Sequence, residues 1–161
     1  MPLHPDTLQR LVFEIRASGV DHQGVYLAAS YDRYEEIQDL ATDLYVQSGI
    51  RISSTWHIAE RINNARWVRA NGKDTLERQR GWADADIRDL DDSGVLVFFQ
   101  GGFTPGKYFE LGLAVGWRKH IIMVEEPARI EVRLGDGEVA HGGGFESVFL
   151  TVGDVVIRAK R

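Results

Sequence analysis

One glutamate stands out as the residue best placed to do chemistry. Glu110 follows a buried apolar run at 95–99 and a loop, residues 101–106, that holds three glycines and a proline. The spacing predicts a helix over 107–118 with Glu110 in its first turn, where the helix dipole favours a partly exposed carboxylate by roughly 0.3–1 kcal/mol. We therefore expect a low pKa and an ionised Glu110. An ionised carboxylate suits a nucleophile or the stabilisation of a developing cation.

Two other interpretations of this segment stay open. Glutamate is common in the first turn of ordinary helices, so Glu110 can be a purely structural residue. Glycine-rich turns that lead into a helix also bind anions such as phosphate. The sequence has neither a Walker pattern nor a complete Gly-x-Gly-x-x-Gly motif, so nucleoside triphosphate hydrolysis is not expected.

The elements that would position Glu110 alternate between strands and helices. Apolar runs predict strands over residues 25–29, 95–99 and 121–124. Residues 50–54, Ile-Arg-Ile-Ser-Ser, are predicted as a further strand, and residues 145–150 as a last strand-like segment. Helical spacing predicts helices over residues 6–18, 37–45, 76–92 and 107–118. Residues 57–74 are expected to be an irregular or partly helical insertion, Gly142 to Gly144 a turn or loop, and residues 154–161 a terminal helix or a frayed tail.

This alternation predicts an α/β fold. We expect a three-layer sandwich around a mainly parallel, Rossmann- or flavodoxin-like sheet of about five strands. Ligands of such sheets bind beyond the carboxyl ends of the strands. The expected binding loops are therefore residues 30–33, 55–57 and 100–110.

Length and composition narrow the classes of function. The 161 residues fit a single domain over 1–161, with residues 1–22 as a helical extension and 127–161 as a separate C-terminal segment. The absence of cysteine excludes disulfides and thiolate chemistry, and the five histidines show no metal-ligand spacing, so no metal or cofactor is expected. A net charge of -5 argues against binding to a nucleic-acid polymer. Without a signal peptide or a bilayer-length apolar run, we expect a soluble cytoplasmic protein with a small-molecule partner and no membrane.

Several segments together resemble the nucleoside 2-deoxyribosyltransferase superfamily, which includes a branch of 2′-deoxynucleoside 5′-monophosphate N-hydrolases. The resemblance covers roughly residues 24–125, and Phe109-Glu-Leu-Gly-Leu-Ala114 is its most specific part. The other segments are Tyr26-Leu-Ala-Ala-Ser30, Asp86-Ile-x-x-Leu90, the apolar run 95–99, Lys119 and the Trp56 site.

The resemblance implies an enzyme that cleaves an N-glycosidic bond. Glu110 matches the glutamate that attacks the anomeric carbon and forms a glycosyl-enzyme intermediate. Asp86 matches the aspartate that protonates the leaving base. Because acidic runs on helices are usually solvated faces, Asp84 and Asp89 remain alternatives to Asp86.

Thr104 bears on whether the substrate carries a 5′-phosphate and whether water or a second base accepts the sugar. In this superfamily, transferases often carry an acid six positions before the nucleophile, and the monophosphate hydrolases carry a small hydroxyl residue; this chain has Thr104 there. A neutral hydroxyl tolerates a phosphate dianion that a carboxylate would repel. The loop at Gly106 and the side chains of Ser30, Arg33 and Lys107 are expected to complete the phosphate site, although Asp32 opposes it. This favours a monophosphate substrate with water as the acceptor over base exchange between unphosphorylated deoxynucleosides.

Aromatic side chains near the expected site can stack on a base. Tyr31 and Trp56 are our first choices, and the other candidates are Tyr26, Phe103 and Tyr108. The resemblance implies a homodimer or larger oligomer, in which His141 to Phe149 can complete a neighbouring site; a glycine loop without a role is the alternative. A noncatalytic nucleotide-binding module and an NAD-cleaving enzyme are the competing functions.

Overall fold

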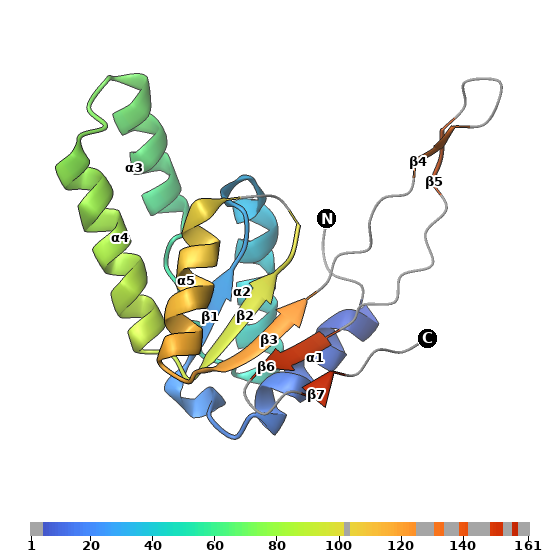
Figure 1. Cartoon of the computed structure of the whole chain (residues 1–161). Coiled ribbons are helices and arrows are strands. Elements are labelled where there is room, and N and C mark those ends of the chain that lie inside the picture. Colours follow the sequence, from blue (N-terminus) through green and yellow to red (C-terminus); the bar gives the residue numbers. More distant parts are fainter. Residues whose placement is uncertain are drawn as a thin grey trace.

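Three parallel strands form the centre of the molecule, which is described by a computed structural model for residues 5–101, 104–124, 131–133, 139–141, 149–152 and 156–157. The strands are β1 (Val25–Ala28), β2 (Val95–Phe99) and β3 (His120–Val124), in the order β1-β2-β3 (Figure 1). Every residue of β1 and β2 is buried, as expected of strands covered on both faces. The α/β class and these three strands confirm what the apolar runs predicted.

Beyond β3 the sheet continues with antiparallel strands. β6 (Phe149–Val152) pairs with β3, and β7 (Val156–Ile157) pairs with β6. β4 (Glu131–Arg133) and β5 (Val139–His141) form a separate antiparallel pair. Of the two alternatives for residues 154–161, the terminal helix is wrong at residues 156–157, which form a strand; the predicted loop at Gly142 to Gly144 and residues 145–148 lie outside the described residues.

The strand predicted over 50–54 is wrong, and the edge of β1 shows why. This segment makes one isolated parallel bridge, between Val25 and Ile52. Further along β1, side chains take the place of main-chain partners. The Ser54 hydroxyl accepts the Leu27 N–H at 3.1 Å, and the Trp56 indole N–H donates to the Leu27 carbonyl at 2.7 Å. The edge of β1 is thus satisfied without a continuous strand beside it.

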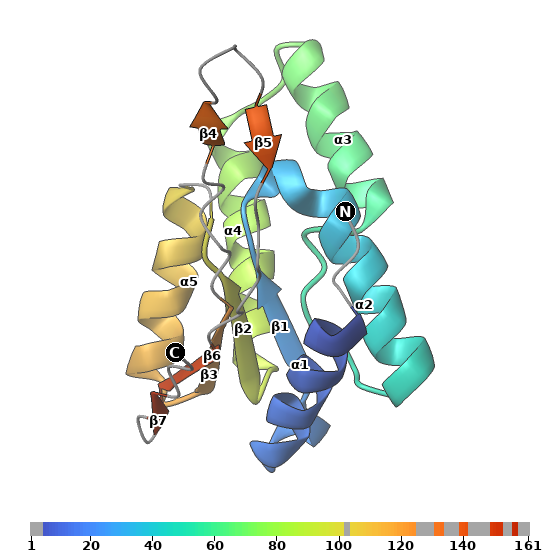
Figure 2. The same cartoon turned by 90° about the vertical axis from the view of Figure 1, so that its right-hand side faces the viewer.

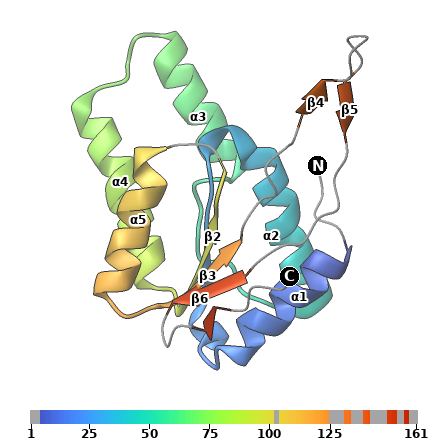
Figure 3. The same ribbon diagram turned by 45° about the vertical axis from the view of Figure 1, so that its right-hand side comes forward.

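Helices lie on both sides of these strands. They are α1 (Pro5–Ala17), α2 (Tyr34–Ser48), α3 (Ala59–Ala70), α4 (Leu76–Asp91) and α5 (Pro105–Gly116), with short 3-10 turns η1 (Asp21–Gln23) and η2 (Tyr31–Arg33). Figures 2 and 3 show α4 and α5 on one side of the strands and α1 and α2 on the other. Most of the segment 57–74, which was expected to be irregular or partly helical, forms the helix α3.

Helix boundaries follow from local sequence signals. Gly49 ends α2 with φ 65°, a left-handed conformation that glycine adopts without strain. The Thr75 hydroxyl caps α4 by accepting the Arg78 N–H at 3.3 Å. Pro105 begins α5, where its missing N–H costs nothing. Leu11 and Ile15 of α1 are fully buried, so this helix contributes to the same core as the strands.

Candidate active site

Glu110 of α5 lies against β1, which brings together residues 84 positions apart in the chain. The Tyr26 hydroxyl donates a hydrogen bond to Glu110 Oε1 at 2.7 Å. Tyr26 is fully buried, and this burial, together with the nearby Glu110 and Asp86, raises its pKa well above the usual range. Tyr26 therefore remains a protonated phenol that donates to the carboxyl.

The surroundings of Glu110 overturn the expectation of a low pKa. Burial raises the pKa of Glu110 to about 7; the hydrogen bond from Tyr26 opposes this rise, the charge of Asp86 adds to it and Arg61 lowers it. The helix begins at Pro105, so Glu110 lies beyond its first turn and gains little from the helix dipole. Pro105 is the sequence signal that predicts this earlier start, because proline is favoured at the first position of a helix.

Asp86 of α4 provides the second carboxyl of the site. Its Oδ1 lies 2.7 Å from Arg61 Nη2 of α3, and both side chains are mostly buried. Burial raises the pKa of Asp86, and the charge and hydrogen bonding of Arg61 act in the opposite direction. The charge of Asp86 also raises the pKa of Glu110, so the titration of one carboxyl influences that of the other.

The two alternatives to Asp86 have different surroundings. Asp84 is exposed on α4. Asp89 Oδ2 accepts hydrogen bonds from the Thr55 N–H at 2.9 Å and from the Thr55 hydroxyl at 2.6 Å. Asp89 therefore fixes the segment after residue 54 against α4. Asp86 remains the best candidate for the proton donor.

Two of the side chains expected to bind phosphate have partners in the protein. The Lys107 ammonium is buried and donates to the carbonyls of Phe99 at 3.0 Å and Gly101 at 2.7 Å. The buried Ser30 hydroxyl donates to the same Gly101 carbonyl at 3.0 Å. These bonds hold the start of the loop between β2 and α5, which is a structural role.

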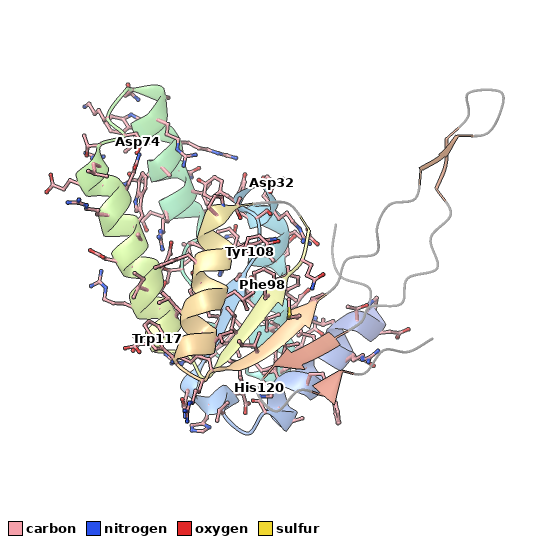
Figure 4. All side chains as sticks on the ribbon, viewed as in Figure 1. Asp32, Asp74, Phe98, Tyr108, Trp117 and His120 are labelled. Carbon is pink, nitrogen blue, oxygen red and sulfur yellow. The ribbon has the colours of Figure 1, made fainter. Side chains whose placement is uncertain are left out.

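Arg33 also has a partner within the protein. Its guanidinium donates to both carboxylate oxygens of Glu36, at 2.9 and 2.8 Å, and lies 5.7 Å from the centre of the Phe99 ring. Phe98 contacts Tyr108 of α5 edge to face with ring centres 5.4 Å apart (Figure 4). Because neighbouring strand residues point to opposite faces, Arg33 and Tyr108 lie on opposite sides of the sheet.

The expected aromatic pair is in contact but differs in exposure. The rings of Tyr31 and Trp56 lie 6.5 Å apart at 34°. Trp56 is buried and bonded to β1, so it belongs to the core; stacking on a base would need Trp56 to become accessible. Tyr31 is partly buried, and its hydroxyl oxygen has no hydrogen-bond partner among the described residues. Tyr31 is thus the more accessible of the two rings.

The remaining predicted positions lie at the start of α5. Thr104 is the residue before the helix, and its side chain makes no capping hydrogen bond, which leaves the hydroxyl available. Gly106 is in the first turn, with open space where a Cβ would lie. Phe103 lies outside the described residues, and nothing in the structure tests a role for residues 127–161 at a neighbouring site.

Two side chains of this candidate site were not predicted in these positions from the sequence. Tyr26 was considered only as an aromatic surface, and its contact with Glu110 depends on the pairing of distant elements. Arg61 was not considered at all, because α3 was not predicted with a defined face. Its other guanidinium contacts are 3.1 Å to the Thr55 hydroxyl and 3.0 Å to the Trp82 carbonyl.

His57 and the possibility of a metal site are considered for the described residues. His57 is buried, its Nε2 lies 3.2 Å from the Ser54 hydroxyl, and burial lowers its pKa to about 4, so the ring is neutral. Among the described residues, no group of three or more His, Asp or Glu side chains is arranged to hold a metal ion. The described helices also include none that is long and apolar enough to cross a membrane.

Comparison with known proteins gives no match: neither a protein-family model, nor a curated protein, nor a solved structure is similar to this chain.

Proposed function

We propose that this protein cleaves the N-glycosidic bond of a nucleoside or nucleoside 5′-monophosphate through a covalent intermediate on Glu110. The observation that carries the proposal is the group of Tyr26, Glu110 and Asp86: a mostly buried carboxyl that accepts a hydrogen bond from a phenol, with a second carboxyl close enough to shift its pKa. Pairs of carboxyl groups of this kind perform glycoside cleavage in other enzymes. The resemblance of the segments around Glu110 and Asp86 to the deoxyribosyltransferase superfamily supports the same reaction and a three-layer sandwich fold.

The proposed reaction has two steps. In the reactive form Glu110 is ionised and Asp86 carries the proton, which is the less populated arrangement because burial raises the pKa of Glu110 and Arg61 favours the ionised form of Asp86. Glu110 attacks the anomeric carbon, the bond to the base nitrogen breaks, and that nitrogen takes the electron pair and a proton from Asp86. Water then attacks the anomeric carbon and gives a proton to Asp86, and the ester bond to Glu110 breaks. Burial of both carboxyls strengthens their attraction to the cationic transition state, because little water screens them.

We propose a 5′-monophosphate as the first substrate to test, with water as the acceptor. The support is Thr104, a neutral residue at the N-terminus of α5 whose hydroxyl does not cap the helix. The helix N-terminus favours an anion at this position. A cytoplasmic homodimer or larger oligomer is part of the same proposal.

One observation favours a second candidate, the exchange of bases between unphosphorylated deoxynucleosides. Ser30, Arg33 and Lys107 are all bonded within the protein, so a phosphate would have to displace these contacts. An unphosphorylated sugar could bind without displacing these hydrogen bonds. A noncatalytic binding module on the same scaffold is the third candidate.

A panel experiment separates these candidates. The full chain is incubated with nucleosides and 5′-monophosphates, with and without a second free base, and released base is measured by chromatography. Release from monophosphates without an acceptor is expected. Exchange on unphosphorylated deoxynucleosides would support the transferase, and no release from any compound would reject catalysis in favour of a binding module.

A further inference from the structure

Arg61 of α3 contacts Asp86 and also the loop and helix that position Asp86. Its Nη2 lies 2.7 Å from Asp86 Oδ1 and donates to the Trp82 carbonyl at 3.0 Å, so two of its contacts are on α4. Its Nη1 donates to the Thr55 hydroxyl at 3.1 Å, and Thr55 is bonded in turn to Asp89. The guanidinium is thus fixed by three separate groups, and its side chain is only 18% exposed.

The charged and titratable groups around Asp86 come from four elements. They are Arg61 of α3, Asp89 of α4, Glu110 of α5 and the phenol of Tyr26 of β1. Asp89 repels a negative charge on Asp86, Asp86 in turn repels one on Glu110, and Tyr26 is neutral. Arg61 is the member of this set that attracts such a charge, and it acts on Glu110 as well.

We propose that Arg61 is a positioning residue of the site, which orients Asp86 and sets the protonation of the Asp86–Glu110 pair. The proposal rests on the proposed function for its kinetic consequence. A fixed cation stabilises the ionised form of each carboxyl, so the protons of the pair leave at lower pH than they would without it. Arg61 reaches the reaction through Asp86 and does not need to touch the substrate.

The first test is the titration of the two carboxyls by carbon-13 NMR on the full chain, with resonances assigned from Asp86→Asn and Glu110→Gln. In Arg61→Gln we expect the titration midpoints of Asp86 and Glu110 to rise by about one pH unit. Arg61→Lys keeps the charge on a different geometry and should give midpoints between those of the wild type and Arg61→Gln. If Arg61→Gln does not fold, the rise in Arg61→Lys carries the test.

The matched control is Arg66→Gln on the same helix. Arg66 is exposed and donates to the Tyr34 hydroxyl at 2.9 Å, so its loss should leave both midpoints unchanged. A folded Arg61→Gln variant whose midpoints equal those of the wild type would overturn the proposal.

Kinetics provide the second test, because a merely structural role would not move a pH profile. Loss of Arg61 raises both carboxyl midpoints, so the whole pH profile of base release should shift to higher pH by about one unit. An unshifted profile with active enzyme would overturn the proposal. If neither the wild type nor any variant releases base but the midpoints shift, the proposed function fails while the assignment of Arg61 stands.

Discussion

At the scale of single residues, Glu110 combines a buried carboxyl with a pKa close to neutral. The folded protein binds the Glu110 proton more tightly than the unfolded chain does, because burial raises the pKa from 4.5 to about 7. The free energy of unfolding therefore falls as pH rises through this window, because Glu110 becomes ionised and burial disfavours the ionised carboxylate. A site that keeps such a group accepts a cost in stability at neutral pH, as functional sites often do.

This cost gives a prediction for Glu110→Gln. The amide cannot ionise, so the variant should be more stable than the wild type by about 2–3 kcal/mol at pH 8 and similar to it at pH 4.5. Base release should fall by at least about 10³-fold, because the nucleophile is gone. Urea unfolding at the two pH values and a rate assay check both parts. A variant less stable than the wild type at pH 8 would show that Glu110 is structural.

Tyr26 should act on the pKa of Glu110 through its hydroxyl. Tyr26→Phe removes the 2.7 Å hydrogen bond, so the Glu110 midpoint should rise above its wild-type value and stability should fall by about 1–3 kcal/mol. If the midpoint rises by about one unit from about 7, the ionised fraction of Glu110 at pH 7, and with it base release, should fall about fivefold. NMR titration measures the midpoint. Tyr45→Phe, at a 65% exposed tyrosine on α2, is the control, and an equal effect in both variants would contradict the assignment.

At the scale of elements, the segment after residue 50 ties β1 to α4. Ser54 and Trp56 bond to Leu27 of β1, and Thr55 between them bonds to Asp89 of α4. These contacts place α3 and its Arg61 beside Asp86. The position of the second carboxyl therefore depends on a loop that contributes side chains to the sheet edge.

Asp89→Ala should show the importance of this loop. The change leaves the Thr55 N–H without its acceptor, so we expect a loss of about 2 kcal/mol in the free energy of unfolding. Asp84→Ala, at an exposed position of the same helix, should change it by less than about 0.5 kcal/mol. Denaturant unfolding compares the two, and equal losses would contradict the anchoring role.

The same loop shows what sequence patterns could and could not predict. Apolar runs predicted β1, β2 and β3, because a buried strand is encoded by its own residues. Residues 50–54, Ile-Arg-Ile-Ser-Ser, also suggested a strand, but the side chains of Ser54 and Trp56 replace strand pairing, which no periodicity reveals. The raised pKa of Glu110 was equally hidden, since it depends on burial of the carboxyl by the packed elements and on the charge of Asp86 from another helix.

At the scale of the whole molecule, the first helix is part of the core rather than an appended extension. Leu11 and Ile15 are fully buried in the cluster that includes β1 and β2. Leu11→Ala should therefore destabilise the protein by about 2–4 kcal/mol. Phe13→Ala, at a 65% exposed position of the same helix, should cost less than about 0.5 kcal/mol. Thermal unfolding of both variants checks this, and a mild effect of Leu11→Ala would mean that α1 is dispensable.

The covalent intermediate on Glu110 is the central claim, and trapping it is the most direct test. The full chain and its Glu110→Gln variant are incubated with 2′-fluoro nucleosides and their 5′-monophosphates, whose fluorine slows breakdown of the glycosyl intermediate, and the intact mass is measured after quenching. We predict the addition of one sugar to the wild type, located by peptide mapping on Glu110, and no addition to the variant. Sugar attached to another residue, or equal base release by both proteins, would contradict the account.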